Sequence, residues 1–452
     1  MLENLLNYLE DKKILILGYG MEGESSYRFI RKHFPTKNIY IADKNTSIVN
    51  DNVELMEDEY VEVSLGENYL NGIEEYDLIL KAPGISLKDV DVSKFENKLK
   101  SELELFLEFV DIFTIGITGT KGKSTTSSLM YKVLIDQGKD AYLLGNIGEP
   151  IFNDIEKFNK DTIAVIELSS HALEFVKKSP KIGFLLDIFE EHLDHYKDLN
   201  RYIEAKYNVG KYQEEGNYLI YNYDNELMNK YNFNYKKNDY AVSINEVLDT
   251  VNKMYIKEGN IYCNENKLMS VNEPMNLKGM HNIQNIMFIL ACSNIMKLDF
   301  EKVIKSIKGF EPLEHRMEFV ATIDDVSYYN DSIATIPAAT INAIKAIGNI
   351  NTIIVGGKDR GVDLTTVIEY IKQSDIENVI CLPKTGEYIK EGLKDTKKNV
   401  VFTEKLDEAV KLAKKYTKKG TNCLLSPAAS SYGYFKNFEE RGKLFKKYVL
   451  DK

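Results

Sequence analysis

Short apolar runs, separated by longer stretches with helical periodicity, recur along this chain of 452 residues. Apolar runs without alternating polar positions predict strands buried on both faces, as in a parallel sheet that helices cover. The predicted strands are 14–17, 39–42, 78–80, 141–144, 163–168, 182–186, 352–355, 379–382 and 422–425. The predicted helices are 22–31, 102–110, 125–134, 200–212, 283–296 and 300–307. The pattern therefore predicts an α/β protein.

Three such series of strands and helices predict three domains, because a single hydrophobic core does not grow to this chain length. We expect the domains to span 1–101, 102–312 and 313–452, with a linker at Gly309-Phe-Glu-Pro-Leu313. Short alternating strands within 222–273 predict a small antiparallel annex to the middle domain. Because glycine-rich turns follow the first strands of the first two segments, the expected fold class is a Rossmann-like N-terminal domain, a central P-loop ATPase-like α/β domain with this annex, and a C-terminal Rossmann-like α/β domain.

The stretch after the apolar run that ends at Ile117 predicts a phosphate-binding loop. It reads Gly119-Thr-Lys-Gly-Lys-Ser-Thr125 and runs into helix-forming residues. Glycines allow a tight turn whose N–H groups point at one phosphate, and a helix N-terminus attracts negative charge. Lys123 would neutralise the terminal phosphates, and the Ser124 hydroxyl would bind the accompanying Mg²⁺. The candidate triphosphate-binding residues here are Gly119, Thr120, Lys121, Gly122, Lys123, Ser124 and Thr125.

A second glycine turn, Gly18-Tyr-Gly-Met-Glu-Gly23, follows the first predicted strand and opens a helix. Asp43 ends the next strand, which is the dinucleotide-binding pattern with the carboxylate on a ribose. This pattern alone indicates NAD, but the same turn binds other nucleotide diphosphates, and it also occurs as a purely structural turn. A third turn, Ala82-Pro-Gly-Ile-Ser86, could add N–H donors. The candidate residues are Gly18, Gly20, Gly23, Asp43 and Gly84.

The composition limits the partners and the compartment. A net charge of −11 argues against nucleic acid and anionic membranes as partners. No apolar run is long enough to span a bilayer, and the first residues are expected to lead directly into a strand without an apolar leader. The four cysteines have no paired spacing, which predicts reduced thiols in a cytoplasmic protein. We expect a monomer.

Carboxylate and histidine side chains follow two strands of the middle domain, at the sheet edge that the phosphate loop would share. Glu167 ends one strand and His192 follows another, and both are candidate ligands of a cation that bridges phosphates. Asn146, after a further strand, could orient an oxygen. His171 and His195 are more simply explained as structural histidines. Lys206 lies on a predicted helix, where a lysine is by residue type alone a solvated surface residue.

The motifs together resemble the Mur ligase family, which builds the peptide stem of peptidoglycan, over essentially the whole chain. Besides the phosphate loop, the shared motifs are Gly145-Asn-Ile-Gly148, Glu167-Leu-Ser-Ser170, Glu191-His-Leu-Asp194, Gly279-Met-His-Asn282 and His315-Arg316. Two more, Asn330-Asp-Ser-Ile-Ala-Thr335 and the ending Ser426 to Gly442, resemble the member that adds D-glutamate. The resemblance implies an ATP-dependent ligase that joins D-glutamate to UDP-N-acetylmuramoyl-L-alanine through an acyl phosphate.

The resemblance also implies roles for individual residues. Two Mg²⁺ ions are expected, the first on Ser124 and Glu167, the second on His192 and on Lys206 carried as a carbamate. Asn146 would lie near the acyl phosphate, and the N-terminal glycine turn with Asp43 would bind the UDP moiety instead of NAD. The expected catalytic residues are Lys123, Asn146, His192 and Lys206. Asn282, Arg316 and Asp331 are expected on ATP, and Thr335, Arg360, Ser431 and Phe438 on the amino acid.

Three positions depart from the family pattern at the amino-acid pocket. Ile333 and Arg360 stand where lysines are common, and Gly433 replaces an aspartate. Because arginine can still hold a carboxylate bidentately, an acidic amino acid remains the expectation. A ligase for L-glutamate or another acidic amino acid stays open as an alternative. Two other classes are an NAD-dependent oxidoreductase and a nucleotide-gated binding protein without chemistry.

Overall fold

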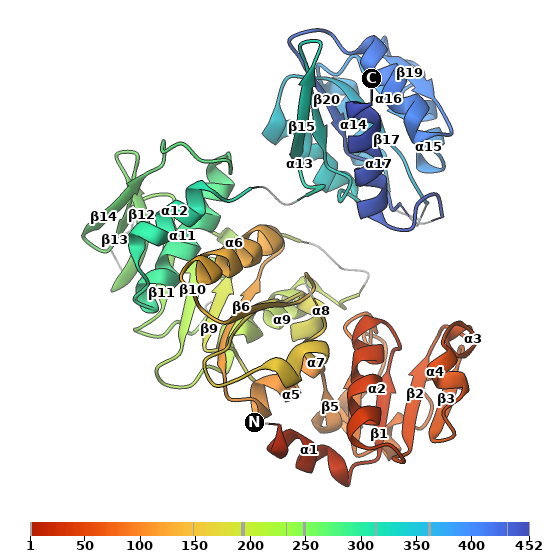
Figure 1. Cartoon of the computed structure of the whole chain (residues 1–452), viewed down its shortest axis with the longest axis vertical. Helices are drawn as coiled ribbons and strands as arrows, with labels where there is room; N and C mark the ends of the chain where they lie inside the picture. Colours follow the sequence, from red (N-terminus) through yellow and green to blue (C-terminus); the bar gives the residue numbers. More distant parts are fainter. Residues whose placement is uncertain are drawn as a thin grey trace. The chain divides into compact units, whose positions relative to one another are not determined.

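The computed structural model describes residues 2–147, 149–190, 195–231, 233–246, 250–311, 314–359, 363–431 and 433–451. The chain divides into two compact units, Met1–Phe310 and Glu311–Lys452. The first unit contains a five-stranded and a nine-stranded sheet, and the second contains a six-stranded sheet (Figure 1). The predicted α/β class is confirmed. Each sheet falls within one of the three predicted segments, but the division of the first unit at residue 101 stays a prediction.

The first sheet is parallel throughout, with the order β3-β2-β1-β4-β5. Strand β1 lies between β2, the next strand along the chain, and β4, to which the chain returns after β3. Ligands of such sheets bind beyond the carboxyl ends of the strands at this reversal. The strands are β1 (Ile14–Leu17), β2 (Ile39–Asp43), β3 (Val61–Leu65), β4 (Leu78–Lys81) and β5 (Leu99–Lys100).

The second sheet has the order β14-β13-β12-β11-β10-β9-β6-β8-β7, with β6 between β9 and β8. Its strands are β6 (Phe113–Thr118), β7 (Ala141–Gly145), β8 (Ile163–Glu167), β9 (Ile182–Leu185), β10 (Tyr218–Asn222), β11 (Tyr240–Ser243), β12 (Asn252–Lys257), β13 (Asn260–Cys263) and β14 (Asn266–Ser270). The last three strands are antiparallel, as expected of the annex. The annex is not a separate body, because β12 also pairs in parallel with β11 and so extends the main sheet.

The helices of this unit cover both sheets. They are α1 (Glu3–Glu10), α2 (Met21–His33), α3 (Ile48–Asp51), α4 (Val53–Met56), α5 (Glu102–Phe109), α6 (Lys123–Asp136), α7 (Ile151–Asp154), α8 (Ser170–Leu173), α9 (Leu199–Lys211), α10 (Glu226–Lys230), α11 (Met280–Ile295) and α12 (Phe300–Lys308). One buried cluster extends from Leu5 through Ile16 and Phe106 to Ile166, so the two sheets share a core. The expectation that the chain leads directly into a strand is wrong: α1 comes first, because Leu5 and Leu9, four residues apart, are both buried in that core.

The second unit has the sheet order β15-β16-β20-β17-β18-β19, parallel except for the β15–β16 hairpin. Its strands are β15 (Glu318–Ile323), β16 (Val326–Asn330), β17 (Ile350–Val355), β18 (Asn378–Cys381), β19 (Asn399–Phe402) and β20 (Asn422–Leu425). Its helices are α13 (Pro337–Ile347), α14 (Thr365–Gln373), α15 (Thr385–Gly392), α16 (Leu406–Tyr416) and α17 (Phe438–Leu450). Separate buried clusters contain Ile353 and Ile354, which point to opposite faces of β17.

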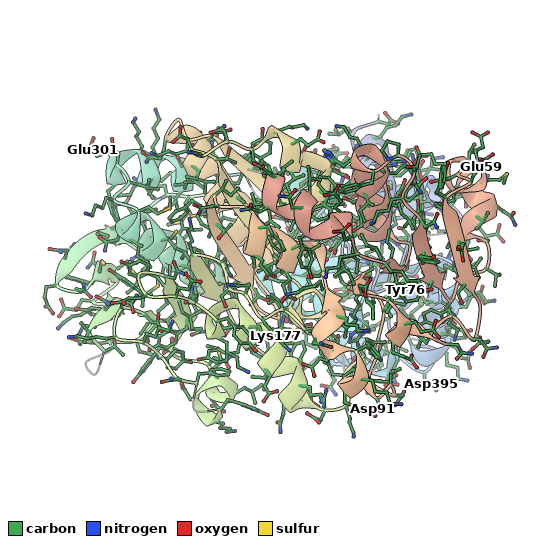
Figure 2. The ribbon with its side chains drawn as sticks, turned by 90° about the horizontal axis from the view of Figure 1, so that it is seen from below. Glu59, Tyr76, Asp91, Lys177, Glu301 and Asp395 are labelled. Carbon is green, nitrogen blue, oxygen red and sulfur yellow. The ribbon has the colours of Figure 1, made fainter. Side chains whose placement is uncertain are left out.

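Charged side chains such as Glu59, Lys177 and Glu301 are exposed around the ribbon (Figure 2). The cysteines Cys263, Cys292, Cys381 and Cys423 are all buried and unbridged. Among the described residues, none of the helices combines the length and the apolar composition that crossing a bilayer requires.

Candidate active site

The predicted phosphate loop is a tight turn between β6 and α6. Gly122 caps α6 with a φ of +85°, a backbone conformation that residues with a Cβ avoid. A Cβ at this position would lie 2.7 Å from Asn285 Oδ1 on α11, so the loop and that helix approach closely only because Gly122 has no side chain. The loop therefore presents the N-terminus of α6, where N–H groups attract an anion.

Two lysines converge on one backbone oxygen of this loop. Lys123 Nζ donates to the carbonyl of Gly119 at 2.9 Å and to that of Thr120 at 3.0 Å. Lys206 Nζ donates to the same Gly119 carbonyl at 2.7 Å. Lys206 is only 2% exposed, so its interpretation as a solvated surface lysine is wrong. Two ammonium groups at one carbonyl concentrate positive charge beside the phosphate loop.

Glu167 and Asn146 lie together at the end of the neighbouring strand β8. Asn146 Nδ2 donates to Glu167 Oε1 at 2.8 Å, and Asn146 N donates to the Glu167 carbonyl at 3.1 Å. Glu167 is 1% exposed, and its Oε2 is buried without a hydrogen-bond partner among the described residues. A buried carboxylate oxygen with no donor is costly unless a cation or an unrecorded donor meets it. The pair thus provides one oxygen for a cation and holds it in place with an amide.

The remaining loop residues divide into anchored and exposed ones. Thr120 is anchored: its N–H donates to the Asp187 carbonyl at 2.6 Å, and its Oγ1 lies 2.7 Å from the Tyr202 hydroxyl. Thr125 is buried, Ser124 is half-buried and Lys121 is exposed. Sequence reasoning did not identify Tyr202, which lies one helical turn before Lys206 on α9.

Asn282 lies at the start of α11, and Asn285 connects it to the phosphate loop. Asn285 Nδ2 donates to Asn282 Oδ1 at 3.3 Å, and Asn285 is the side chain against Gly122. Sequence reasoning missed Asn285. Its signal was the spacing of three residues from Asn282, which puts both amides on one face of a helix.

Two predicted site residues lie outside the described residues: the metal ligand His192 and Arg360, which was predicted to contact the amino acid. Among the residues that are described, no group of three His, Cys, Asp or Glu side chains is arranged to hold a metal. The two histidines interpreted as structural lie in one cluster: the rings of His171 and His195 are 4.0 Å apart, and His195 Nε2 lies 3.1 Å from Glu174 Oε2.

The N-terminal glycine turn lies at the carboxyl end of β1. A Cβ on Gly23 would lie 2.1 Å from the Gly18 carbonyl, so the close approach of α2 to the strand requires glycine there. Gly18 has a φ of +94°. A Cβ on Gly18 would lie 2.6 Å from the side chain of Ile85, in the turn that contains Gly84. Asp43 accepts from the N–H groups of Tyr19 and of Asn45, both at 2.7 Å. The structure thus brings Gly18, Gly23, Gly84 and Asp43 together, with Gly20 as the N-cap of α2.

In the second unit, Asp331 accepts a hydrogen bond from the backbone of the residue that follows Arg316. Asp331 Oδ1 accepts from Met317 N at 3.2 Å, and its Oδ2 accepts from Ser426 Oγ at 2.8 Å. Burial raises the pKa of Asp331 to about 7, and the Ser426 hydrogen bond opposes this shift. Arg316 is half-buried and directly precedes Met317. The two predicted nucleotide residues are therefore neighbours.

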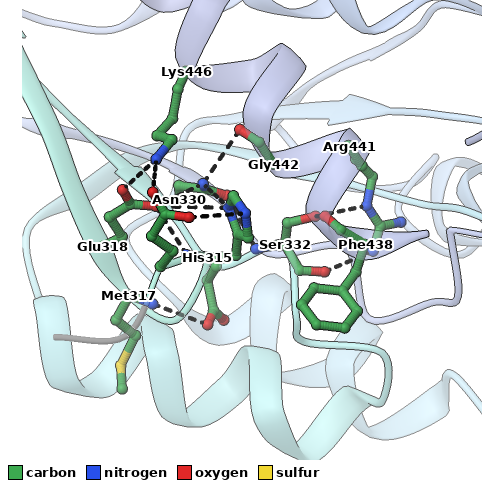
Figure 3. Close-up of polar contacts among 11 residues, drawn as sticks. His315, Met317, Glu318, Asn330, Ser332, Phe438, Arg441, Gly442 and Lys446 are labelled. Carbon is green, nitrogen blue, oxygen red and sulfur yellow. Dashed lines mark hydrogen bonds and ion pairs between the residues drawn. The ribbon is translucent and has the colours of Figure 1, made fainter. Parts of the chain in front are cut away.

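Of the residues predicted to hold the amino acid, Phe438 is linked through Ser332 to the buried Arg441. Ser332 Oγ donates to the Phe438 carbonyl at 2.8 Å, and Arg441 Nη2 donates to the Ser332 carbonyl at 2.7 Å (Figure 3). Thr335 is half-buried and Ser431 is buried. Gly433, a departure from the family pattern, has a φ of +90°. A backbone in this conformation suits glycine better than the aspartate it replaces.

Comparison with known proteins agrees with the motifs. The family model described as the Mur ligase middle domain matches residues 117–293, and that described as the Mur ligase glutamate ligase domain matches residues 315–429. UDP-N-acetylmuramoylalanine–D-glutamate ligase of Caldanaerobacter subterraneus is 34% identical over 98% of this chain and 99% of its own. The enzyme with that name from Clostridium tetani is 31% identical over 98% of this chain and 97% of its own.

Solved structures share the fold at low sequence identity. UDP-N-acetylmuramate–alanine ligase from Thermotoga maritima matches with a TM-score of 0.59 and 16% identity, over 96% of this chain and 98% of its own. The MurF ligase of the same organism, solved with ADP, matches with a TM-score of 0.56 and 16% identity. The match covers 91% of this chain and 95% of that ligase. Relatives above 30% identity that are matched along nearly their full length establish the assignment: the chain belongs to the Mur ligase family.

Proposed function

We propose that this protein is an ATP-dependent ligase that adds D-glutamate to UDP-N-acetylmuramoyl-L-alanine in peptidoglycan synthesis. The observation that carries the proposal is the convergence of Lys123 and Lys206 on the Gly119 carbonyl, at the sheet edge that also holds Glu167. The convergence puts a cation for the phosphates, Lys123, beside two candidate metal ligands, Glu167 and the carbamate of Lys206. The full-length relatives, which are named for this reaction, support the same substrates.

The proposed reaction has two steps. The carboxylate of the nucleotide-linked L-alanine attacks the γ-phosphorus of ATP; the bond to the bridging oxygen breaks, and ADP leaves with its electron pair. The amine of glutamate then attacks the acyl phosphate, loses a proton and expels inorganic phosphate, forming the amide. Lys123 would hold the negative charge on the transferred phosphoryl group, and Asn146 would orient an acyl oxygen. Thr120, Lys121, Gly122 and Thr125 would line the phosphates, with Asn282, Arg316 and Asp331 on the rest of ATP.

Mg²⁺ fits the residues beside the loop. The buried Glu167 Oε2, which has no donor among the described residues, is suited to a hard cation. Ser124 is the second residue of α6, the helix that follows the neighbouring strand β6. When bound, Mg²⁺ would neutralise phosphate charge during transfer. A second ion would need His192 and a carbamate on Lys206, formed when the neutral amine adds CO₂ and releases a proton. This modification would replace the cation by an anionic oxygen ligand in a buried place.

The sites for the UDP moiety and for the amino acid are proposed from where their candidate residues lie in the fold. Gly18, Gly20, Gly23, Asp43 and Gly84 meet at the strand reversal of the first sheet, which suits the UDP moiety. Thr335, Arg360, Ser431 and Phe438 would hold the amino acid. We further propose a monomer in the cytoplasm, in line with the unbridged buried cysteines and the small nucleotide-linked substrate. No nucleic acid and no membrane insertion are part of the proposal.

Amino-acid choice is the sharpest test of the proposal, because Ile333 and Arg360 replace the lysines that the family pattern has there. The assay follows phosphate release from ATP with the nucleotide-linked acceptor and D-glutamate, L-glutamate or aspartate offered separately. We expect D-glutamate to give the highest kcat/KM. Equal or faster turnover with another acid would replace D-glutamate in the proposal. NAD(H), added at millimolar concentration, is expected to leave the rate unchanged.

A further inference from the structure

Arg316 lies between two residues whose backbones adopt an unfavourable conformation. His315 has a φ of +62° and Met317 a φ of +47°. Residues with a Cβ rarely adopt this left-handed region, and two such residues in three positions do not persist unless their surroundings hold them. We call residues 315–317 the arginine turn. Its shape must be held by contacts from elsewhere in the unit.

Two carboxylates hold the backbone of the arginine turn. Glu318 Oε2 accepts from His315 N at 2.8 Å, and Asp331 Oδ1 accepts from Met317 N at 3.2 Å. The N–H groups on both sides of Arg316 are thus each held by a carboxyl oxygen from another part of the unit. The His315 ring is also fixed, because a Cβ on Gly442 would lie 2.2 Å from its Nδ1.

Glu318 is surrounded by donors. Its Oε2 also accepts from Asn330 Nδ2 at 3.0 Å, and its Oε1 pairs with Lys446 Nζ at 2.7 Å (Figure 3). Both oxygens therefore face N–H groups. A glutamine has no charge and only one carbonyl oxygen, so the hydrogen bonds from His315 N and Asn330 Nδ2 either become neutral or lose their acceptor.

We propose that Glu318 is a positioning residue for nucleotide binding: its carboxylate holds the arginine turn so that Arg316 is presented to ATP. The proposal rests on the proposed function, which assigns Arg316 to ATP. The proposed role does not require Glu318 to touch the nucleotide. Its effect on affinity passes through the conformation of the turn.

Glu314 provides a matched control. It also pairs with Lys446 Nζ, at 3.0 Å, and its side chain is 65% exposed. Glu314→Gln therefore removes a carboxylate from the same lysine, but leaves the bond to His315 N in place. Lys446→Met removes the ion pair of Glu318 and also leaves that backbone bond.

The experiment measures the Kd of a non-hydrolysable ATP analogue by calorimetry on the full chain and four variants. Arg316→Met should weaken binding most. Glu318→Gln should weaken binding about tenfold, in line with the loss of one hydrogen bond to a charged group. Glu314→Gln and Lys446→Met should change Kd less than about twofold, as expected for partly exposed ion pairs. The affinity for the nucleotide-linked acceptor should stay unchanged in all four.

The outcomes separate the two proposals. If Arg316→Met binds the analogue like the parent chain, the assignment of Arg316 to ATP fails. If Arg316→Met weakens binding of the analogue while Glu318→Gln does not, the positioning role is overturned. It is also overturned if Lys446→Met binds the analogue as weakly as Glu318→Gln does. Should Glu318→Gln fail to fold, Glu318→Asp keeps the charge but retracts the oxygens. A Kd for Glu318→Asp equal to that of the parent chain would then overturn the role.

Discussion

Two turns of the first unit share a backbone design and differ in charge. The glycine turn after β1 and the phosphate loop after β6 both follow a buried parallel strand, and in both a glycine is the N-cap of the next helix. Each presents backbone N–H groups where an anion can bind. The first turn of α2, however, contains Glu22 and Glu24, whereas that of α6 begins with Lys123 and has no acid.

The side chains around the two turns continue this difference. At the phosphate loop, two lysines donate hydrogen bonds to the Gly119 carbonyl. At the N-terminal turn, by contrast, the Asp43 carboxylate accepts the hydrogen bond of Tyr19 N. Burial raises the pKa of Glu22 to about 7, and Lys81 lowers it in part. Backbone shape makes an anion site at both turns, but the first turn of α6 adds the cation Lys123, whereas that of α2 adds acids. The other turn is better suited to holding a ligand than to reacting with it.

The largest expected effect is at the cation of the phosphate loop. Lys123→Met should reduce the rate of phosphate release by about 10³-fold or more, because the charge on the transferred group loses its partner. Circular dichroism should show that the chain remains folded. Lys132→Met, on the same helix, is the control and should keep its activity. Substantial ligation by Lys123→Met would contradict the assignment of the phosphate loop.

The second effect tests the buried lysine that the fold brings to this loop. Lys206→Ala should lower turnover about 10²-fold, because a metal ligand formed from its amine is lost. Added acetate or another short carboxylate should restore part of the rate by occupying the vacated space. Lys211→Ala, exposed at the end of α9, should behave like the parent chain. Full activity of Lys206→Ala would leave this lysine a structural role only.

The third effect addresses the backbone of the N-terminal turn. Gly23→Ala should reduce the free energy of unfolding by about 1–3 kcal/mol, because its methyl group would overlap the Gly18 carbonyl. Urea unfolding measures this change. Gly20→Ala is the matched control: its methyl group would meet no atom within 4 Å, so stability should stay within about 0.5 kcal/mol. Equal losses in the two variants would show that close packing at Gly23 is unimportant.

The smallest effect concerns the acid that distinguishes the two turns. The pKa of Glu22 is raised from 4.5 to about 7, so the folded chain binds this proton more tightly than the unfolded chain. Its contribution to stability is complete below pH 4.5 and is lost as pH rises to about 7. Melting temperatures between pH 4.5 and 7.5 should fall less steeply in Glu22→Gln than in the parent chain. Identical slopes in Glu22→Gln and the parent would contradict the shift, and Glu24→Gln controls for loss of an acid from the same turn.

Much of the fold followed from local pattern. The strands at 14–17, 78–80 and 422–425 were found within one residue because buried parallel strands are continuous apolar runs. Strands such as β3 and β19 were missed, since edge strands are exposed and lack that pattern. The antiparallel annex was predicted, but sequence does not give the parallel pairing of β12 with β11 that joins it to the main sheet.

The amino-acid sequence by itself determined the two glycine turns and the place of Glu167 at a strand end, because each depends on the backbone freedom and chemistry of adjacent residues. The tertiary structure alone decided that Lys206, 87 positions from Gly119, is buried against that residue. It also decided that Glu318 and Asp331 hold the arginine turn. The physical reason is that such contacts depend on strand order: β6 lies between β8 and β9, which gathers distant side chains at one sheet edge.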